Sequence, residues 1–295
     1  MMSNMDTVGT IEMTKVFYEF GMLGCLHKFY TVEEIHAISD EPFFANAIVS
    51  TGILDHDLEK LDQIVKACPK LRFICLDVAN GYTQRFIDTV ALVRQRYPHL
   101  TIIAGNVVTQ EISEELILKW ADIVKVGIGA WSTCITRIQT GVGYPQLSAV
   151  IECSDAAHGI GGRIIADSGI VNPGDVVKAF GAGADFTMMG GMFAGHDQCG
   201  DAIIEEWWKK YMEHYGMSSD VAMTKHFGWV AEYRASEGKC VKVPYKGDVR
   251  NTIQSILWGL RSACTYVGAR TLKELPKCTT FIRCSQQSNE VRGKN

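Results

Sequence analysis

The sequence predicts one α/β domain over residues 1–295, a parallel (β/α)8 barrel whose first strand is largely missing. Three observations lead to this fold class. Short β-rich runs alternate with longer amphipathic segments, and nearly every run ends in polar or glycine residues. The length also fits a single barrel of about 250 residues with insertions.

The composition is that of a globular protein without a nucleic-acid or membrane surface. Hydrophobic residues make up 47% and charged residues 21%, and the net charge is −4 with Lys and Arg scattered along the chain. We therefore expect no nucleic-acid partner. No apolar run approaches the ~20 residues of a membrane span, and residues 1–6 carry no targeting signal, so we expect a cytosolic protein.

The ten cysteines predict free thiols and no structural metal. No two of them form a C-x2-C pair of the zinc type. Cys25 and Cys75 lie inside apolar runs, where a free thiol behaves as a small hydrophobe. This usage favours a reducing compartment.

Seven runs are expected to be strands, and the segments between them are expected to be helices. Residues 83–96, for example, space apolar side chains three and four apart, as a helix packed on one face does. The expected strands span residues 22–27, 43–49, 72–78, 101–106, 122–127, 163–167 and 185–190.

This alternation predicts a parallel sheet, either closed as a barrel or open and doubly wound. The polar ends favour the barrel, because there they converge on one rim, where such folds place their chemistry. Only residues 1–8 are left to supply the eighth strand. Two long excursions, 128–162 and 192–250, break the rhythm and are the first places to seek a site.

The loop that follows residue 127 contains the first candidate nucleophile, Cys134. Residues 127–137, Gly-Ile-Gly-Ala-Trp-Ser-Thr-Cys-Ile-Thr-Arg, place this thiol among hydroxyls, backbone N–H groups and Arg137. A nearby positive charge favours the thiolate, which is the nucleophilic form. Spacing alone does not decide between a nucleophile and an inert thiol, because most cysteines are inert.

Glycines at the ends of the last two runs predict a phosphate site. Asp167-Ser168-Gly169 and Gly190-Gly191 stand there, and glycine lets backbone N–H groups approach a phosphate. The G-x-G at 181–183 precedes a strand and is expected to end a helix instead. Residues 232–238 group two carboxylates, an arginine and a serine, either as a site or as a solvated face.

Several of these segments, taken in order, resemble the GMP reductases, relatives of IMP dehydrogenase. The resemblance extends from residue 4 to residue 283, and no short motif decides it alone. The matching blocks are His27-Lys28, Cys75-Leu-Asp-Val-Ala-Asn-Gly-Tyr82, Ala104-Gly-Asn-Val-Val108, Thr140-Gly-Val-Gly-Tyr-Pro-Gln-Leu-Ser-Ala-Val150, Gly216-Met-Ser-Ser219 and Ala231-Glu-Tyr-Arg-Ala-Ser-Glu-Gly-Lys239.

The resemblance implies a TIM barrel that reduces GMP to IMP and ammonia with NADPH. Cys134 matches the family's nucleophile, which attacks purine C2 and leaves a covalent thioimidate for hydride delivery. Thr136 and Glu237 match its proton-handling pair. Lys28 and Asp77 match a second charged pair, beside the nicotinamide and the leaving group. Family members form homotetramers, so the same assembly is expected here.

The resemblance also implies three sets of binding residues. In the substrate set, Asp167 is expected on the ribose hydroxyls, and the phosphate is expected on Ser132, Gly169, Gly190 and Gly191. The base is expected among Met217, Ser218, Arg234, Ser236 and Gly238, and Gly216 belongs to the same set. The cofactor set is Asp77, Val78, Ala79, Ile128, Gly129, Met217, Ser262, Ala263, Cys264 and Thr265. A potassium ion is expected on backbone carbonyls of Gly129, Trp131, Cys134 and Arg137.

Three departures from the family pattern bear on activity. The family begins well upstream of residue 1, has Pro-Gly where Ala130-Trp131 stands, and has Asp-Gly-Gly where Asp167-Ser168-Gly169 stands. Trp131 therefore puts an indole where glycine shapes the cation site. Two alternatives stay open: an IMP dehydrogenase-like oxidoreductase, and a non-catalytic subunit that binds GMP. Against the first, the chain has no room for the regulatory tandem domain that many dehydrogenases insert.

Overall fold

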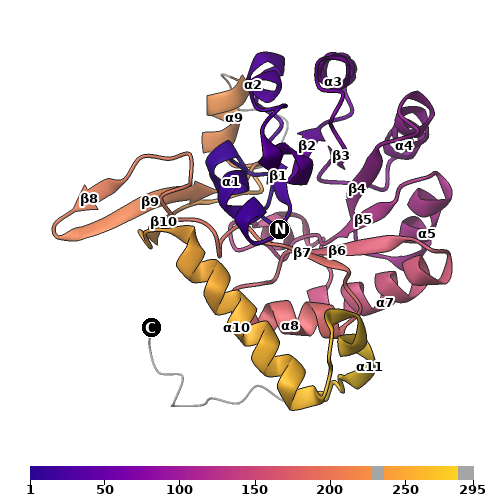
Figure 1. Cartoon of the computed structure of the whole chain (residues 1–295), viewed down its shortest axis with the longest axis vertical. Helices are drawn as coiled ribbons and strands as arrows, with labels where there is room; N and C mark the ends of the chain where they lie inside the picture. The colour runs from indigo at the N-terminus through magenta and orange to yellow at the C-terminus, as the bar shows by residue number, and fades with distance from the viewer. Residues whose placement is uncertain (228–235, 285–295) are drawn as a thin grey trace.

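The computed structural model describes residues 1–227 and 236–284, in which seven parallel strands form one curved sheet. The strands follow one another in chain order from β1 to β7, and each pairs in parallel with the next (Figure 1). Their bounds are β1 Gly24–Leu26, β2 Ala47–Thr51, β3 Phe73–Asp77, β4 Thr101–Val107, β5 Ile123–Val126, β6 Arg163–Asp167 and β7 Phe186–Met188.

The N-terminal residues join the two edges of this sheet. Met2 forms parallel bridges with both Gly24, at β1, and Met189, just after β7. The Ser3 amide donates to the Met189 carbonyl at 2.9 Å, and the Met189 amide donates to the Met1 carbonyl at 3.1 Å. The segment expected to supply the eighth strand thus takes that position, and the predicted barrel fold is confirmed.

Buried side chains on both faces of the strands explain why the strand runs are almost wholly apolar. One ring of side chains fills the barrel interior and includes Cys25, Ile48, Cys75 and Ile103. The alternate residues, such as Ile74, face the surrounding helices in a second and larger cluster. Because successive strand side chains point to opposite faces, each strand contributes to both clusters.

Helices surround the sheet, as Figure 1 shows. The helix expected over residues 83–96 is α4, and the Thr83 hydroxyl caps it by accepting from the Phe86 amide. The helices are α1 Ile11–Glu19, α2 Val32–Ala37, α3 Asp55–Ala67, α4 Gln84–Arg96, α5 Gln110–Leu118, α6 Thr136–Thr140, α7 Gln146–Gly159, α8 Pro173–Gly181, α9 Asp220–Phe227, α10 Val249–Val267 and α11 Leu275–Cys278.

Two regions differ from the sequence expectations. The second strand begins at Ala47, because Pro42–Asn46 forms the 3-10 helix η1, with proline in its first turn and the following phenylalanines buried. The excursion over 192–250 contains an antiparallel sheet that extends away from the barrel (Figure 1): β8 Ile204–Glu206, β9 Lys209–Tyr215 and β10 Cys240–Pro244. Its largely exposed strands lack the apolar runs that mark the barrel strands.

Glycines end the helices α6 and α8, and the second of them lies in the G-x-G segment that was expected to end a helix. Gly141 caps α6 in the left-handed region, at φ 72°, and Gly183 follows α8 at φ 103°. A second 3-10 helix, η2 Leu272–Glu274, precedes α11. Within residues 1–227 and 236–284, no helix is both long and apolar enough to cross a membrane.

Candidate active site

Cys134 begins a hydrogen-bonded chain that ends at a carboxylate. Its thiol donates to the Thr136 hydroxyl at 3.0 Å, and that hydroxyl donates to Glu237 Oε2 at 2.7 Å. All three side chains are partly exposed, so a ligand can reach them. A thiol, a hydroxyl and a carboxylate in this order can pass a proton from sulfur to oxygen, which leaves the nucleophilic thiolate.

Backbone pairing between two distant segments holds Glu237 against the cysteine loop. Cys134 and Gly238 form an antiparallel bridge, in which the Ile135 amide donates to the Glu237 carbonyl at 2.8 Å. The Lys239 amide donates to the Thr133 carbonyl at 2.9 Å on the other side. About one hundred residues of sequence separate these segments, so the structure alone brings the carboxylate to the thiol.

The expected base-binding residues gather at the same place, and glycines make the close approach possible. A Cβ on Gly238 would lie 2.9 Å from the Ser219 amide nitrogen and 3.1 Å from Gly216 Cα. The Glu237 amide donates to the Ser218 carbonyl, and the Ser236 hydroxyl donates to the Gly238 carbonyl at 3.1 Å. Arg234, the remaining residue expected on the base, lies outside the described residues.

A second cluster joins the carboxyl ends of β3, β5 and β6 through the buried Lys125. Its ammonium donates to Asp77 and lies 3.2 Å from Asp167 Oδ2. Asn106, on β4, donates to the same Oδ2 at 2.9 Å. Asp167 is only 2% exposed, so its charge is held by these donors and not by water.

The pKa values of this cluster follow from its charges. Burial alone would raise the pKa of Asp77, but the adjacent Lys125 lowers it below its usual value, with a smaller contribution from Lys28. Burial alone would lower the pKa of Lys125, whereas Asp77 and Asp167 raise it well above its usual value. Lys28 therefore affects the pKa of Asp77 only through a weaker charge interaction, whereas Lys125 donates directly to the Asp77 carboxylate.

Every residue expected on the phosphate lines one cavity of about 470 Å³. Its lining includes Ser132, Gly169, Gly190 and Gly191. A Cβ on Gly191 would lie 2.9 Å from the Ser132 hydroxyl, so glycine is needed there for the two loops to meet. The prediction that the last two strand ends and the cysteine loop share one site is consistent with this geometry.

Comparison with known proteins places these features in a family. A family model described as the IMP dehydrogenase / GMP reductase domain matches residues 1–292. The chain belongs to this family. It is 59% identical over 292 residues to the GMP reductase of Klebsiella pneumoniae, an alignment that covers 98% of this chain and 84% of that protein.

Two animal relatives agree with the bacterial one. The chain is 58% identical over 293 residues to human GMP reductase 1, covering 99% of this chain and 85% of the relative. It is also 58% identical over 292 residues to the Caenorhabditis elegans GMP reductase, covering 98% and 82% respectively. The family resemblance stated from the sequence is confirmed.

Apart from Met217, which lies in the turn between β9 and α9, the expected cofactor residues of this family member fall into two separated groups. Asp77, Val78 and Ala79 lie at the carboxyl end of β3, and Ile128-Gly129 follow β5, on the rim that carries Cys134. The remaining group, residues 262–265, lies in the C-terminal half of α10, which packs against α8 on the outside of the barrel (Figure 1). The structure does not bring the two groups together within one chain.

Two of the four residues expected on potassium, Trp131 and Arg137, have carbonyls that accept a hydrogen bond. The Trp131 carbonyl accepts from the Cys134 amide, and the Arg137 carbonyl accepts from the Gly141 amide, both at 3.1 Å. Each carbonyl oxygen keeps a second lone pair. The Arg137 guanidinium donates to the Tyr144 carbonyl. It therefore holds the loop together, whereas the sequence suggested that its charge lies beside the Cys134 thiol.

Four polar residues of the site were not singled out from the sequence. Lys125 and Asn106 hold Asp167, and Lys246 and His214 line the phosphate cavity. Lys125 left a signal, since it is the one charged residue in the apolar run Ile-Val-Lys-Val. Lys246 left none, because its ammonium reaches the cavity from the distant excursion and lies 3.2 Å from the Met192 carbonyl.

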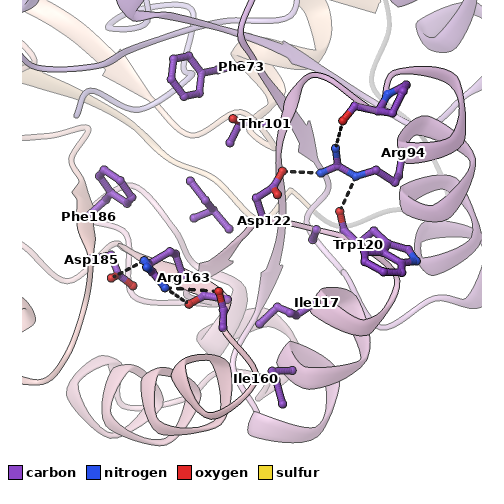
Figure 2. A pocket seen from close by; sticks show the side chains of 15 residues that line it. Phe73, Arg94, Thr101, Ile117, Trp120, Asp122, Ile160, Arg163, Asp185 and Phe186 are labelled. Carbon is purple, nitrogen blue, oxygen red and sulfur yellow. Dashed lines mark hydrogen bonds and ion pairs between the residues drawn. The ribbon is translucent and has the colours of Figure 1, made fainter.

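The opposite end of the barrel contains a larger cavity of about 890 Å³, shown in Figure 2. Its charged residues are tied to their neighbours. Arg94 donates to the carbonyls of Leu100 and Trp120 and pairs with Asp122, while Arg163 pairs with Asp185. These contacts fix loops at the amino ends of the strands, so we place the chemistry at the smaller cavity.

Proposed function

We propose that this protein reduces GMP to IMP and ammonia with NADPH, through a bond between Cys134 Sγ and purine C2. The observation that carries the proposal is the relay from the Cys134 thiol through Thr136 to Glu237. The identity of 58–59% to relatives named GMP reductase supports the choice of substrate.

The relay supplies the proton movements of the reaction. Glu237 takes the thiol proton through Thr136, and the Cys134 thiolate adds to C2. The C2–N bond then breaks, and the relay returns the proton to the departing ammonia, which leaves a thioimidate on Cys134. NADPH supplies the hydride to C2. The C2–S bond then breaks and restores the thiolate, so the balance is GMP + NADPH + H⁺ → IMP + NH3 + NADP⁺.

The second cluster and the cavity position the nucleotide for that attack. Asp167 accepts from the ribose hydroxyls, because Lys125 and Asn106 keep its carboxylate charged and oriented. Ser132 and the backbone N–H groups at Gly169, Gly190 and Gly191 receive the phosphate. Lys246 adds a positive charge at the same cavity. Fixing both ends of the ribose phosphate holds the base at Cys134.

The positions of the cofactor residues support an oligomer. Asp77, Val78 and Ala79 would hold the nicotinamide end near Cys134. On α10, Ser262 and Thr265 are exposed, and they would contact the cofactor of a neighbouring copy. We therefore propose a homotetramer, to be checked by light scattering in solution. The free carbonyl lone pairs of Trp131 and Arg137 fit a potassium ion on the cysteine loop. The ten free cysteines agree with a cytosolic setting.

Purified protein tests the proposal directly. We expect NADPH oxidation that requires GMP and rises with potassium, and a loss of at least about 10³-fold in Cys134→Ala. Cys240→Ala is the matched control, because Cys240 is an exposed thiol on β10. Reduction of NAD by IMP would instead favour the dehydrogenase alternative. GMP binding without turnover would favour a non-catalytic subunit.

A further inference from the structure

The indole of Trp131 occupies one oxygen of the buried Asp167. Its Nε1–H donates to Asp167 Oδ1 at 3.2 Å. Both side-chain donors of the cluster, Asn106 and Lys125, use the other oxygen, Oδ2. Trp131 also lines the ligand cavity, so its contact with Oδ1 connects Asp167 to that cavity.

We infer that Trp131 is an internal competitor for the ribose of the substrate and sets the affinity of the site for nucleotides. This inference rests on the proposed function, in which Asp167 holds the ribose hydroxyls. An indole N–H and a ribose O–H each offer one donor to a carboxylate oxygen. One lone-pair position accepts one donor, so a ribose hydroxyl that binds where the indole N–H binds has to displace the indole from Oδ1.

The competition follows from what Asp167 needs in the absence of ligand. A buried carboxylate oxygen without a donor is costly, and the Trp131 N–H removes that cost in the free protein. A ribose hydroxyl then replaces a contact that already exists and gains less than it would at a vacant oxygen. The apparent affinity is the intrinsic affinity multiplied by the fraction of molecules in which the indole has moved away.

The direction of the effect distinguishes competition from support. If Trp131 braced the loop or contacted the nucleotide favourably, its removal would weaken binding. Competition predicts the opposite result for Trp131→Phe, which keeps a ring and removes the donor. We expect about three- to thirty-fold tighter GMP binding, the range left when water partly replaces a hydrogen bond to a charged group. The same factor should lower KM for GMP.

Calorimetric titration of GMP into the wild-type protein, Trp131→Phe and Trp207→Phe tests this inference. Trp207 is the matched control, because it is exposed at the turn between β8 and β9. Titration with inorganic phosphate adds a second readout. Phosphate does not need Asp167, so Trp131→Phe should leave its affinity unchanged. Trp131→Gly, which restores the residue expected from the family, repeats the test if the phenylalanine variant does not fold.

The outcomes separate this inference from the proposed function. Tighter GMP binding by Trp131→Phe supports the inference even if no GMP-dependent NADPH oxidation is found. Unchanged or weaker GMP binding overturns it, including when the wild-type protein turns over GMP. Equal tightening of phosphate binding would also overturn it, because the effect would then not involve the ribose. Absence of GMP binding to every variant would overturn both proposals.

Discussion

The two ends of the barrel both have a cavity and charged residues, and we propose that chemistry takes place at only one of them. At the carboxyl ends of the strands, Lys125 and Asp167 are 3% and 2% exposed, and their charges hold one another. At the amino ends, the larger cavity is bordered by Arg94 and Arg163, which brace loops through backbone carbonyls. Volume therefore does not locate the site, whereas buried and mutually dependent charges do.

The largest expected effect is the removal of Lys125. Lys125→Met leaves the buried Asp167 and the partly exposed Asp77 without their cation, which should lower the free energy of unfolding by about 3–5 kcal/mol. Urea unfolding measures this loss. Lys178→Met removes an exposed ion pair with Asp175 and should cost less than about 1 kcal/mol. A loss as small in Lys125→Met as in this control would refute the contrast between the two ends.

His214 makes the same end sensitive to pH. Burial, with the charge of Lys246 as a smaller cause, lowers the pKa of His214 to about 4. The unfolded chain, with an ordinary histidine pKa, therefore binds more protons between about pH 6.5 and pH 4. The stabilising contribution of neutral His214 is complete above this window and is lost as the pH falls through it.

Replacing His214 should remove that part of the acid sensitivity. In His214→Gln, the fall in unfolding free energy between pH 7 and pH 4.5 should be smaller by about 2 kcal/mol. Denaturant titrations at several pH values measure the slope. His99→Gln is the control at the amino end, because His99 is exposed beside the larger cavity. Equal slopes in His214→Gln and the wild-type protein would contradict the prediction.

Arg94 tests whether the larger cavity serves stability alone. Arg94→Met removes hydrogen bonds to the Leu100, Pro98 and Trp120 carbonyls and should cost about 2 kcal/mol of unfolding free energy. We expect kcat and KM for GMP to stay within about two-fold of the wild-type values. A selective change in KM, with stability intact, would mean that the amino end takes part in function.

Much of the difference between the two ends could be predicted from the sequence, because it depends on short patterns of neighbouring residues. Apolar runs that end in glycine or polar residues located the strands and the functional rim. The family resemblance predicted Cys134, Thr136 and Glu237 as site residues. The antiparallel sheet of β8, β9 and β10 could not be predicted, since its largely exposed strands lack the apolar runs of the barrel strands. The contact of Trp131 with Asp167 could not be predicted either, because it depends on how two loops pack.

Backbone conformation gives the smallest predicted effect and the finest comparison of the two ends. Each end has a non-glycine residue at positive φ: Ser168 at 116° beside Asp167, and Trp120 at 72° beside the larger cavity. Glycine adopts such angles without the clash that a Cβ causes, at a saving of about 1 kcal/mol. Ser168→Gly also loses a weak 3.3 Å hydrogen bond to Gln146, so its net stabilisation should be smaller.

The two glycine variants should therefore separate strain from function. Ser168→Gly and Trp120→Gly should each raise the unfolding free energy by about 0.5–1 kcal/mol, as measured by denaturant unfolding. Only Ser168→Gly should also change KM for GMP, because residue 168 connects Asp167 to the cavity glycine Gly169. If Trp120→Gly changed KM as well, the two ends would be coupled through the strands. The division between a chemical end and a structural end would then be wrong.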